Sequence, residues 1–85
     1  MCTYSTEKVA LERSSGKTRD GWAAMSEATV YYDHPVHAPD AHTINIDFLA
    51  PERGPASRIA VELSLDSARE LLAALQTTVE RAKFH

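Results

Sequence analysis

The sequence predicts an α+β domain in which a four-stranded antiparallel sheet carries a single C-terminal helix packed on one of its faces, in the order ββββα. Three observations lead to this fold class. Apolar and polar residues alternate in four separate segments, which is the period-two pattern of half-buried strands. The last segment changes to a 3.6-residue period, which is typical of an amphipathic helix. The chain has 85 residues, and this length suits a single domain, expected to span residues 1–85.

The four strands are expected at about residues 4–13, 28–33, 43–49 and 58–65. Residues 14–21, which contain Gly16 and Gly21, are expected to form a turn-rich connection that ends in an ordered contact at Trp22. The second strand is expected to stop at His34-Pro35, because proline has no N–H for a ladder hydrogen bond. Short loops favour antiparallel pairing, so the strands are predicted to lie side by side in chain order.

The alternation separates an apolar sheet face from a polar one. The apolar side chains of the third and fourth strands are Ile44, Ile46, Phe48, Ile59, Val61, Leu63 and Leu65. The other face is expected to carry Thr29, Tyr31, Asp33, Asn45, Asp47, Arg58 and Glu62. One face therefore needs a cover, and the other is left to meet water, a second copy or a ligand.

A helix is predicted over about residues 67–83. Its apolar stripe consists of Ala68, Leu71, Leu72, Leu75, Val79 and Ala82. Asp66 or Ser67 is expected to cap its first N–H groups, and Arg81 and Lys83 suit the negative end of its dipole. The leucines of the stripe are expected to pack on the apolar sheet face and complete the core.

The composition limits the classes of protein to which the chain can belong. It is 44% hydrophobic and 25% charged, as in a folded globular domain. The net charge of −3, without a basic cluster, argues against nucleic acid as a partner. No apolar run approaches the roughly 20 residues of a spanning helix, so a cytoplasmic protein without a membrane partner is expected. So small a chain buries little surface alone, which favours a homodimer.

A cluster of histidines is the most unusual feature of the chain. His34, His37 and His42 lie within nine residues and follow Asp33 directly. Imidazole and carboxylate ligands together suit a divalent transition metal such as Zn²⁺, Fe²⁺ or Ni²⁺. These four residues are therefore the candidate metal ligands. The alternative is a set of solvent-facing loop histidines, because the His-x2-His-x4-His spacing matches no established metal-binding motif.

The single cysteine, Cys2, excludes an internal disulfide and a thiolate-rich zinc site within one chain. It is expected to be a small buried apolar residue, or else a nucleophile or metal ligand if the first strand brings it near the histidines. No glycine-rich phosphate loop or Gly-x-Ser-x-Gly elbow is present in the sequence.

A phenol, an amide and a carboxylate are expected together on the polar face. If Asp33 lies opposite Thr43, then Tyr31 lies opposite Asn45, and Asp47 follows on the same surface. Asp47 and Tyr31 are therefore the candidate catalytic residues, acting as general base and acid if burial raises the pKa of the carboxyl group. The alternative is a solvated antiparallel face, which routinely carries such residues.

Several segments together resemble an uncharacterised family of small bacterial proteins, a domain of unknown function. The likeness is carried by the start Met1-Cys2-Thr3, the motif Asp33-His34-Pro35-Val36-His37-Ala38, and the segments His42-Thr43 and Asn45-Ile46-Asp47-Phe48. It covers nearly the full length of the chain. The resemblance implies no activity, so the site residues rest on their chemistry alone.

Three functions follow from these features. The first is a small metal- or small-molecule-binding protein, attached to a biosynthetic pathway, that uses the histidine loop and the polar face. The second is a small enzyme, such as an isomerase, cyclase or hydrolase, that uses Asp47, Tyr31 and a histidine for proton transfer. The third is a structural or regulatory homodimer without a catalytic site.

Overall fold

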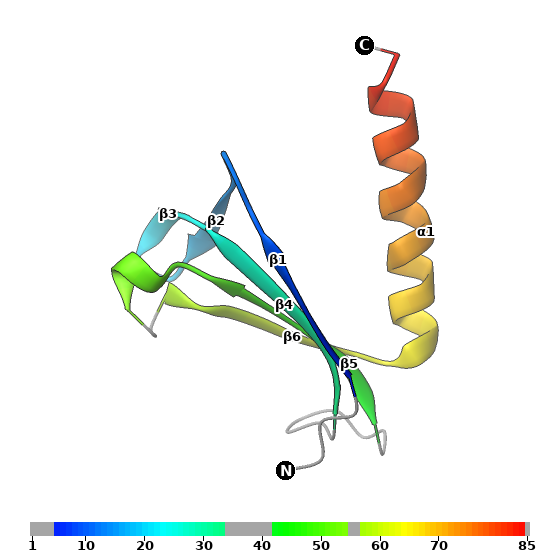
Figure 1. Ribbon diagram of the computed structural model, residues 1–85, viewed down its shortest axis with the longest axis horizontal. Coiled ribbons are helices and arrows are strands. Elements are labelled where there is room, and N and C mark those ends of the chain that lie inside the picture. The colour runs from blue at the N-terminus through cyan, green and yellow to red at the C-terminus, as the bar shows by residue number, and fades with distance from the viewer. Residues whose placement is uncertain (1–4, 34–41, 55–56, 85) are drawn as a thin grey trace.

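The computed structural model describes residues 5–33, 42–54 and 57–84 of the chain. Cys2, His34 and His37 lie outside these residues. In chain order the elements are β1 (Ser5–Ala10), β2 (Ser15–Thr18), β3 (Gly21–Ala24), β4 (Glu27–Asp33), β5 (Thr43–Leu49), the short 3-10 helix η1 (Pro51–Arg53), β6 (Ile59–Leu63) and α1 (Leu65–Ala82). Figure 1 shows a sheet with the β2–β3 hairpin rising at one end and α1 rising at the other.

The main sheet has the order β1-β4-β5-β6, and every neighbouring pair is antiparallel. The α+β class, with its four-stranded antiparallel sheet and single C-terminal helix, is therefore confirmed. Between β4 and β5, Asp33 pairs with Thr43 and Tyr31 pairs with Asn45. This is the register expected from the sequence. The apolar face follows from it, because Val30, Ile46 and Val61 form one row across three strands.

A second sheet, the β2–β3 hairpin, occupies the segment that was expected to be a turn-rich connection. The connection is thus shorter than predicted, since only residues 19 and 20 separate the two strands. Gly21 has a φ of +113°, which glycine adopts at little cost. Gly16 lies so close to Met25 and Ile59 that a Cβ atom there would come within 2.9 Å and 3.0 Å of their side chains. The backbone of β2 thus lies very close to its neighbours. This close approach explains why a strand with so few β-forming residues forms here.

The buried core lies beneath this hairpin. Ala23, Met25 and Ala50 are buried together, and Leu11, Phe48 and Ile59 pack against them. The predicted contact at Trp22 is wrong, since that side chain is 66% exposed and its neighbour Ala23 is buried instead. Trp22 alternates onto the outer face of the hairpin, away from the sheet.

Helix α1 begins at Leu65, two residues before the predicted start. Its N-cap is Ser64, whose hydroxyl accepts a hydrogen bond from the Ser67 N–H at 3.1 Å. The predicted cap at Asp66 or Ser67 is therefore wrong. The backbone of Ser64 is extended, as an N-cap requires, whereas Asp66 already lies in the first turn.

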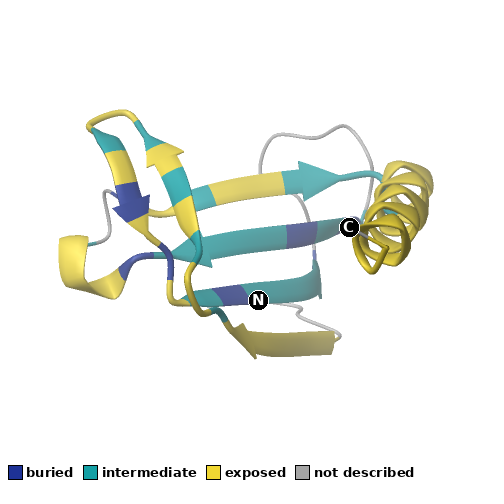
Figure 2. Ribbon diagram, turned by 90° about the horizontal axis from the view of Figure 1, so that it is seen from above, coloured by how far each residue is buried: buried dark blue, intermediate teal, exposed yellow. Residues whose placement is uncertain are grey.

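Helix α1 projects on the apolar side of the sheet and does not pack closely against it. No residue of α1 is buried, and every one except the half-buried Ala68 is exposed (Figure 2). The expectation that Leu71, Leu72 and Leu75 complete the core is therefore wrong for this chain by itself, because all three are exposed. Over residues 5–33, 42–54 and 57–84, no helix combines the length and apolar character needed to cross a bilayer.

Candidate functional site

Three side chains meet on the polar face of the sheet, and we call them the Asp47 trio. The Tyr31 hydroxyl on β4 donates a hydrogen bond to Asp47 Oδ2 on β5 at 3.3 Å. The Arg58 guanidinium, just before β6, donates to the same oxygen at 3.4 Å and forms an ion pair with it. Asp47 and Tyr31, the two candidate catalytic residues, are thus in contact with each other. Arg58 is a third residue of the same site.

The strand registers explain this meeting. Asp47 pairs directly with Thr29 on one side and with Ala60 on the other. Tyr31 and Arg58 each lie two residues from those partners, so both are diagonal neighbours of Asp47 on the same face. Diagonal neighbours lie about 7–8 Å apart at the backbone, within reach of long side chains. The pattern thus contained the signal for the Arg58 contact, although only the face of Arg58 was predicted.

One oxygen of Asp47 is left without a donor. The side chain of Asp47 is 13% exposed, and its Oδ1 atom is buried without a hydrogen-bond partner among the described residues. A buried acceptor that lacks a donor costs about 1–3 kcal/mol. A ligand that brings an N–H or O–H group to Oδ1 would remove this cost, so this oxygen is the chemically incomplete point of the site.

Tyr31 is held in its neutral form by the same surroundings. Its pKa is raised above the ordinary value, first by burial, then by the negative charge of Asp47 and the hydrogen bond to it. The charge of Asp33 adds to this rise, and that of Arg58 opposes it. At neutral pH, Tyr31 is therefore a donor that fixes Asp47 Oδ2 in place.

This raised pKa predicts a loss of stability at alkaline pH. Because folded Tyr31 holds its proton more tightly than the unfolded chain does, its stabilising effect is complete below about pH 10 and declines as the pH rises through the folded pKa. Chemical denaturation at a series of pH values should show this decline in the wild type and a shallower one in Tyr31→Phe. In Asp47→Asn, which lacks the neighbouring charge, phenolate absorbance should show Tyr31 ionising at a lower pH. If Tyr31 of the wild type ionised at or below its ordinary pKa, the raised pKa and its assigned causes would be contradicted.

A buried, hydrogen-bonded pair lies next to the trio on the polar face. Thr43 is fully buried and Asn45 is 3% exposed. The Thr43 hydroxyl donates to Asn45 Oδ1 at 3.0 Å, and Asn45 Nδ2 donates back to the Thr43 carbonyl at 3.3 Å. These residues sit on the same face of β5 as Asp47, which they precede. The predicted alternative of a fully solvated face does not describe this part of the sheet.

A shallow hollow of about 340 Å³ adjoins the trio through Arg58. Its other walls are Leu49, Ala50, Pro51 and Gly54, which are apolar or present backbone. Arg58 is about half exposed, so its guanidinium has N–H groups available beyond the one that contacts Asp47. The site therefore combines a buried, unpaired acceptor on Asp47, the cation of Arg58 and an apolar depression next to Arg58.

Two members of the predicted metal set, Asp33 and His42, lie among the described residues. Asp33 is buried on the polar face at the end of β4. The ring of His42 lies 5.5 Å from that of Tyr32, whose side chain alternates onto the apolar face. Among the described residues, no three His, Cys, Asp or Glu side chains are grouped to hold a metal ion. His34 and His37 lie outside that part of the chain.

Comparison with known proteins places this chain in a family. The model of one protein family, described as a family of unknown function (DUF6295), matches residues 1–85. The predicted resemblance to such a family is thereby confirmed. No curated protein and no solved structure matches the chain.

Proposed function

The chain belongs to this family of unknown function, and we propose that it is a small-molecule-binding protein that holds its ligand on the polar face, at the Asp47 trio. The observation that carries this proposal is the buried Asp47 Oδ1, which has no donor among the described residues. Buried polar atoms are nearly always paired, so an unpaired one is a place where a ligand group fits. A hollow lies nearby, since Arg58 contacts Asp47 and also lines the hollow.

The chemistry of the trio defines the class of ligand. Asp47 Oδ1 accepts an N–H or O–H from the ligand. The remaining N–H groups of Arg58 suit a carboxylate or another acceptor on the same molecule. The hollow beside Arg58 suits a short apolar portion. A small molecule that carries a donor and an acidic group close together, such as an amino acid or a hydroxy acid, matches all three.

A metal-bound form of the same function would use His34, His37 and His42 together with Asp33. Asp33 lies buried on the same face as Asp47 and is followed directly by the histidine segment. If these histidines join Asp33, they complete a mixed imidazole and carboxylate set of the kind that Zn²⁺, Fe²⁺ or Ni²⁺ prefers. Metal analysis of protein purified without a histidine tag, together with thermal shift on adding each ion, tests this form. No bound metal and no shift would remove it.

A second candidate function is proton-transfer catalysis by an isomerase, cyclase or hydrolase. It is favoured by one observation, the direct contact of the Tyr31 hydroxyl with Asp47. Both donors bond Oδ2, so Oδ1 is the atom that would accept a substrate proton. Chemical conversion of a ligand that the protein binds would support the enzyme. Recovery of that ligand unchanged would support binding alone.

The binding proposal is tested by Asp47→Asn. Amino acids and hydroxy acids are screened by thermal shift, and each hit is titrated while backbone amide signals of β4 and β5 are followed by NMR. A hit should move the signals near Tyr31 and Asp47. Asp47→Asn should weaken its binding by about 10- to 100-fold, because hydrogen bonds to charged groups contribute about 1.5–3 kcal/mol.

Asp20→Asn is the matched control. It makes the same chemical change at an exposed residue in the β2–β3 turn, and it should leave the affinity unchanged. Hits that bind Asp47→Asn as tightly as the wild type, or a screen that yields no hit, would overturn the proposal.

A further inference from the structure

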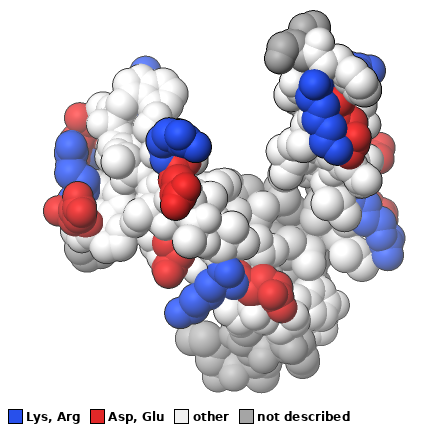
Figure 3. Space-filling view, turned by 45° about the horizontal axis from the view of Figure 1, so that its top comes forward, with Lys and Arg blue, Asp and Glu red and all other residues white. Residues whose placement is uncertain are grey.

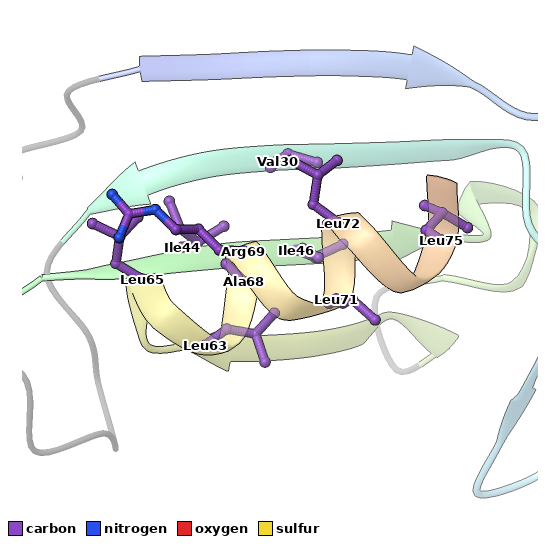
Figure 4. A pocket seen from close by; sticks show the side chains of 10 residues that line it. All are labelled: Val30, Ile44, Ile46, Leu63, Leu65, Ala68, Arg69, Leu71, Leu72 and Leu75. Carbon is purple, nitrogen blue, oxygen red and sulfur yellow. The ribbon is translucent and has the colours of Figure 1, made fainter. Parts of the chain in front are cut away.

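The structure points to a dimer of this chain in which each copy places its helix α1 on the apolar sheet face of the other copy. This inference concerns the sheet face opposite the Asp47 trio and does not depend on the proposed ligand. It begins from an apolar cleft of about 370 Å³ between α1 and the sheet. Leu72 and Leu75 of the helix face Val30, Ile44 and Ile46 across it (Figure 4).

Large apolar side chains are exposed within this cleft and next to it. On α1, Leu71, Leu72, Leu75 and Val79 are 49%, 64%, 60% and 52% exposed. On the sheet, Val61 is 38% exposed. The floor of the hollow between the hairpin and the helix is mostly uncharged (Figure 3). A continuous apolar patch of this kind on a soluble domain marks an interaction surface.

The helix of the same chain is poorly placed to close this cleft. Ser64 is the only residue between β6 and α1, whereas connections that turn a helix back along its strand usually need about 2–6 residues. The side chain of Ser64 is also engaged as the N-cap. Because the link is so short, α1 rises from the end of β6 and stands at an open angle to the sheet (Figure 1).

The amount of exposed surface fits a protein partner. The accessible surface is 6649 Å², whereas a compact monomer of 9.4 kDa should expose about 5,000 Å². The excess of about 1,600 Å² exceeds the roughly 800 Å² that each partner buries in a standard interface. A small apolar ligand in the cleft would leave Val79 and Phe84 exposed, since neither lines it.

A second copy is the partner that the chain itself specifies. The chain carries both a helical stripe that needs an apolar surface and a sheet face that needs an apolar helix. In a two-fold dimer, the helix of each copy covers the apolar sheet face of the other copy. All four apolar surfaces are then buried by one symmetric contact. The exchange also produces the helix-on-sheet core that the sequence pattern predicts, with the helix coming from the other chain.

Light scattering at micromolar concentration tests the dimer directly. The wild type should have a mass twice the 9.4 kDa of one chain. Leu72→Glu should raise the dissociation constant by at least about 30-fold. The substitution removes a leucine contact from the interface and places a charge there that would have to be buried. Thr77→Glu places the same charge on the opposite side of α1 and should leave the mass unchanged.

A second measurement keeps the test decisive if Leu72→Glu fails to fold. In a mixture of isotope-labelled and unlabelled wild-type protein, intermolecular NOEs should connect the methyl groups of Leu72 and Leu75 to those of Val30 and Ile46. A monomeric wild type would overturn the inference, and so would a dimer in which these NOEs arise only within one chain. Asp47→Asn should remain dimeric, so failure of the ligand site and failure of the dimer are separate results.

Discussion

Replacing Met25 with alanine is expected to lower the free energy of unfolding by about 2–5 kcal/mol. Met25 is 3% exposed, and the other buried apolar residues of the described chain are the alanines Ala23, Ala28 and Ala50. It therefore supplies most of the side-chain volume at the centre of the core. It also anchors the chain between β3 and β4, since its N–H donates to the Ser14 carbonyl at 2.9 Å.

The loss is large compared with the roughly 5–15 kcal/mol that stabilises a typical domain. Urea denaturation at one fixed protein concentration measures it, because association would make the midpoint depend on concentration. Lys17→Ala, on the exposed side of the same hairpin, is the control and should change stability by less than about 0.5 kcal/mol. Equal effects of the two substitutions would mean that the hairpin does not form the core.

Thr43→Val is expected to cost about 1–3 kcal/mol, although valine has nearly the same shape as threonine. The Thr43 side chain is fully buried, and its hydroxyl donates to Asn45 Oδ1. Valine keeps the volume and removes the donor, so the buried amide oxygen loses its hydrogen bond. The cost therefore measures polar pairing on this face separately from packing.

Thr6→Val is the matched control for this substitution. Thr6 lies on the edge strand β1, pairs with Tyr31 and is exposed. Thr6→Val should change the urea midpoint little, because water can hydrogen-bond to any group that loses the Thr6 hydroxyl as its partner. An unchanged or raised midpoint in Thr43→Val would show that the buried hydrogen bond adds no stability.

The sequence predicted the sheet well because alternation fixes both strands and register. The expected strand at residues 43–49 has the bounds of β5. Once Asp33 is set opposite Thr43, the contact between Tyr31 and Asp47 follows from the period of two. The site was therefore readable wherever it depends on which face a strand residue occupies.

Other features could not be read from the pattern, because they depend on contacts between distant segments. Gly16, Gly21 and Ala23 have little intrinsic preference for strands, and the β2–β3 hairpin forms through packing on Met25 and Ile59. The stripe on α1 predicts an apolar partner without indicating which sheet provides it. The unpaired oxygen of Asp47 depends on side-chain geometry, which periodicity does not encode.

The edges of the sheet differ in how well they resist unwanted aggregation. Strand β1 forms one edge, and its charged residues Glu7 and Lys8 discourage a foreign strand from adding to it. Strand β6 forms the other edge and has only Glu62 among apolar neighbours such as Ile59 and Val61. Strand β6 is therefore the edge more open to pairing with a foreign strand, and the weaker point of the sheet against fibril-like growth.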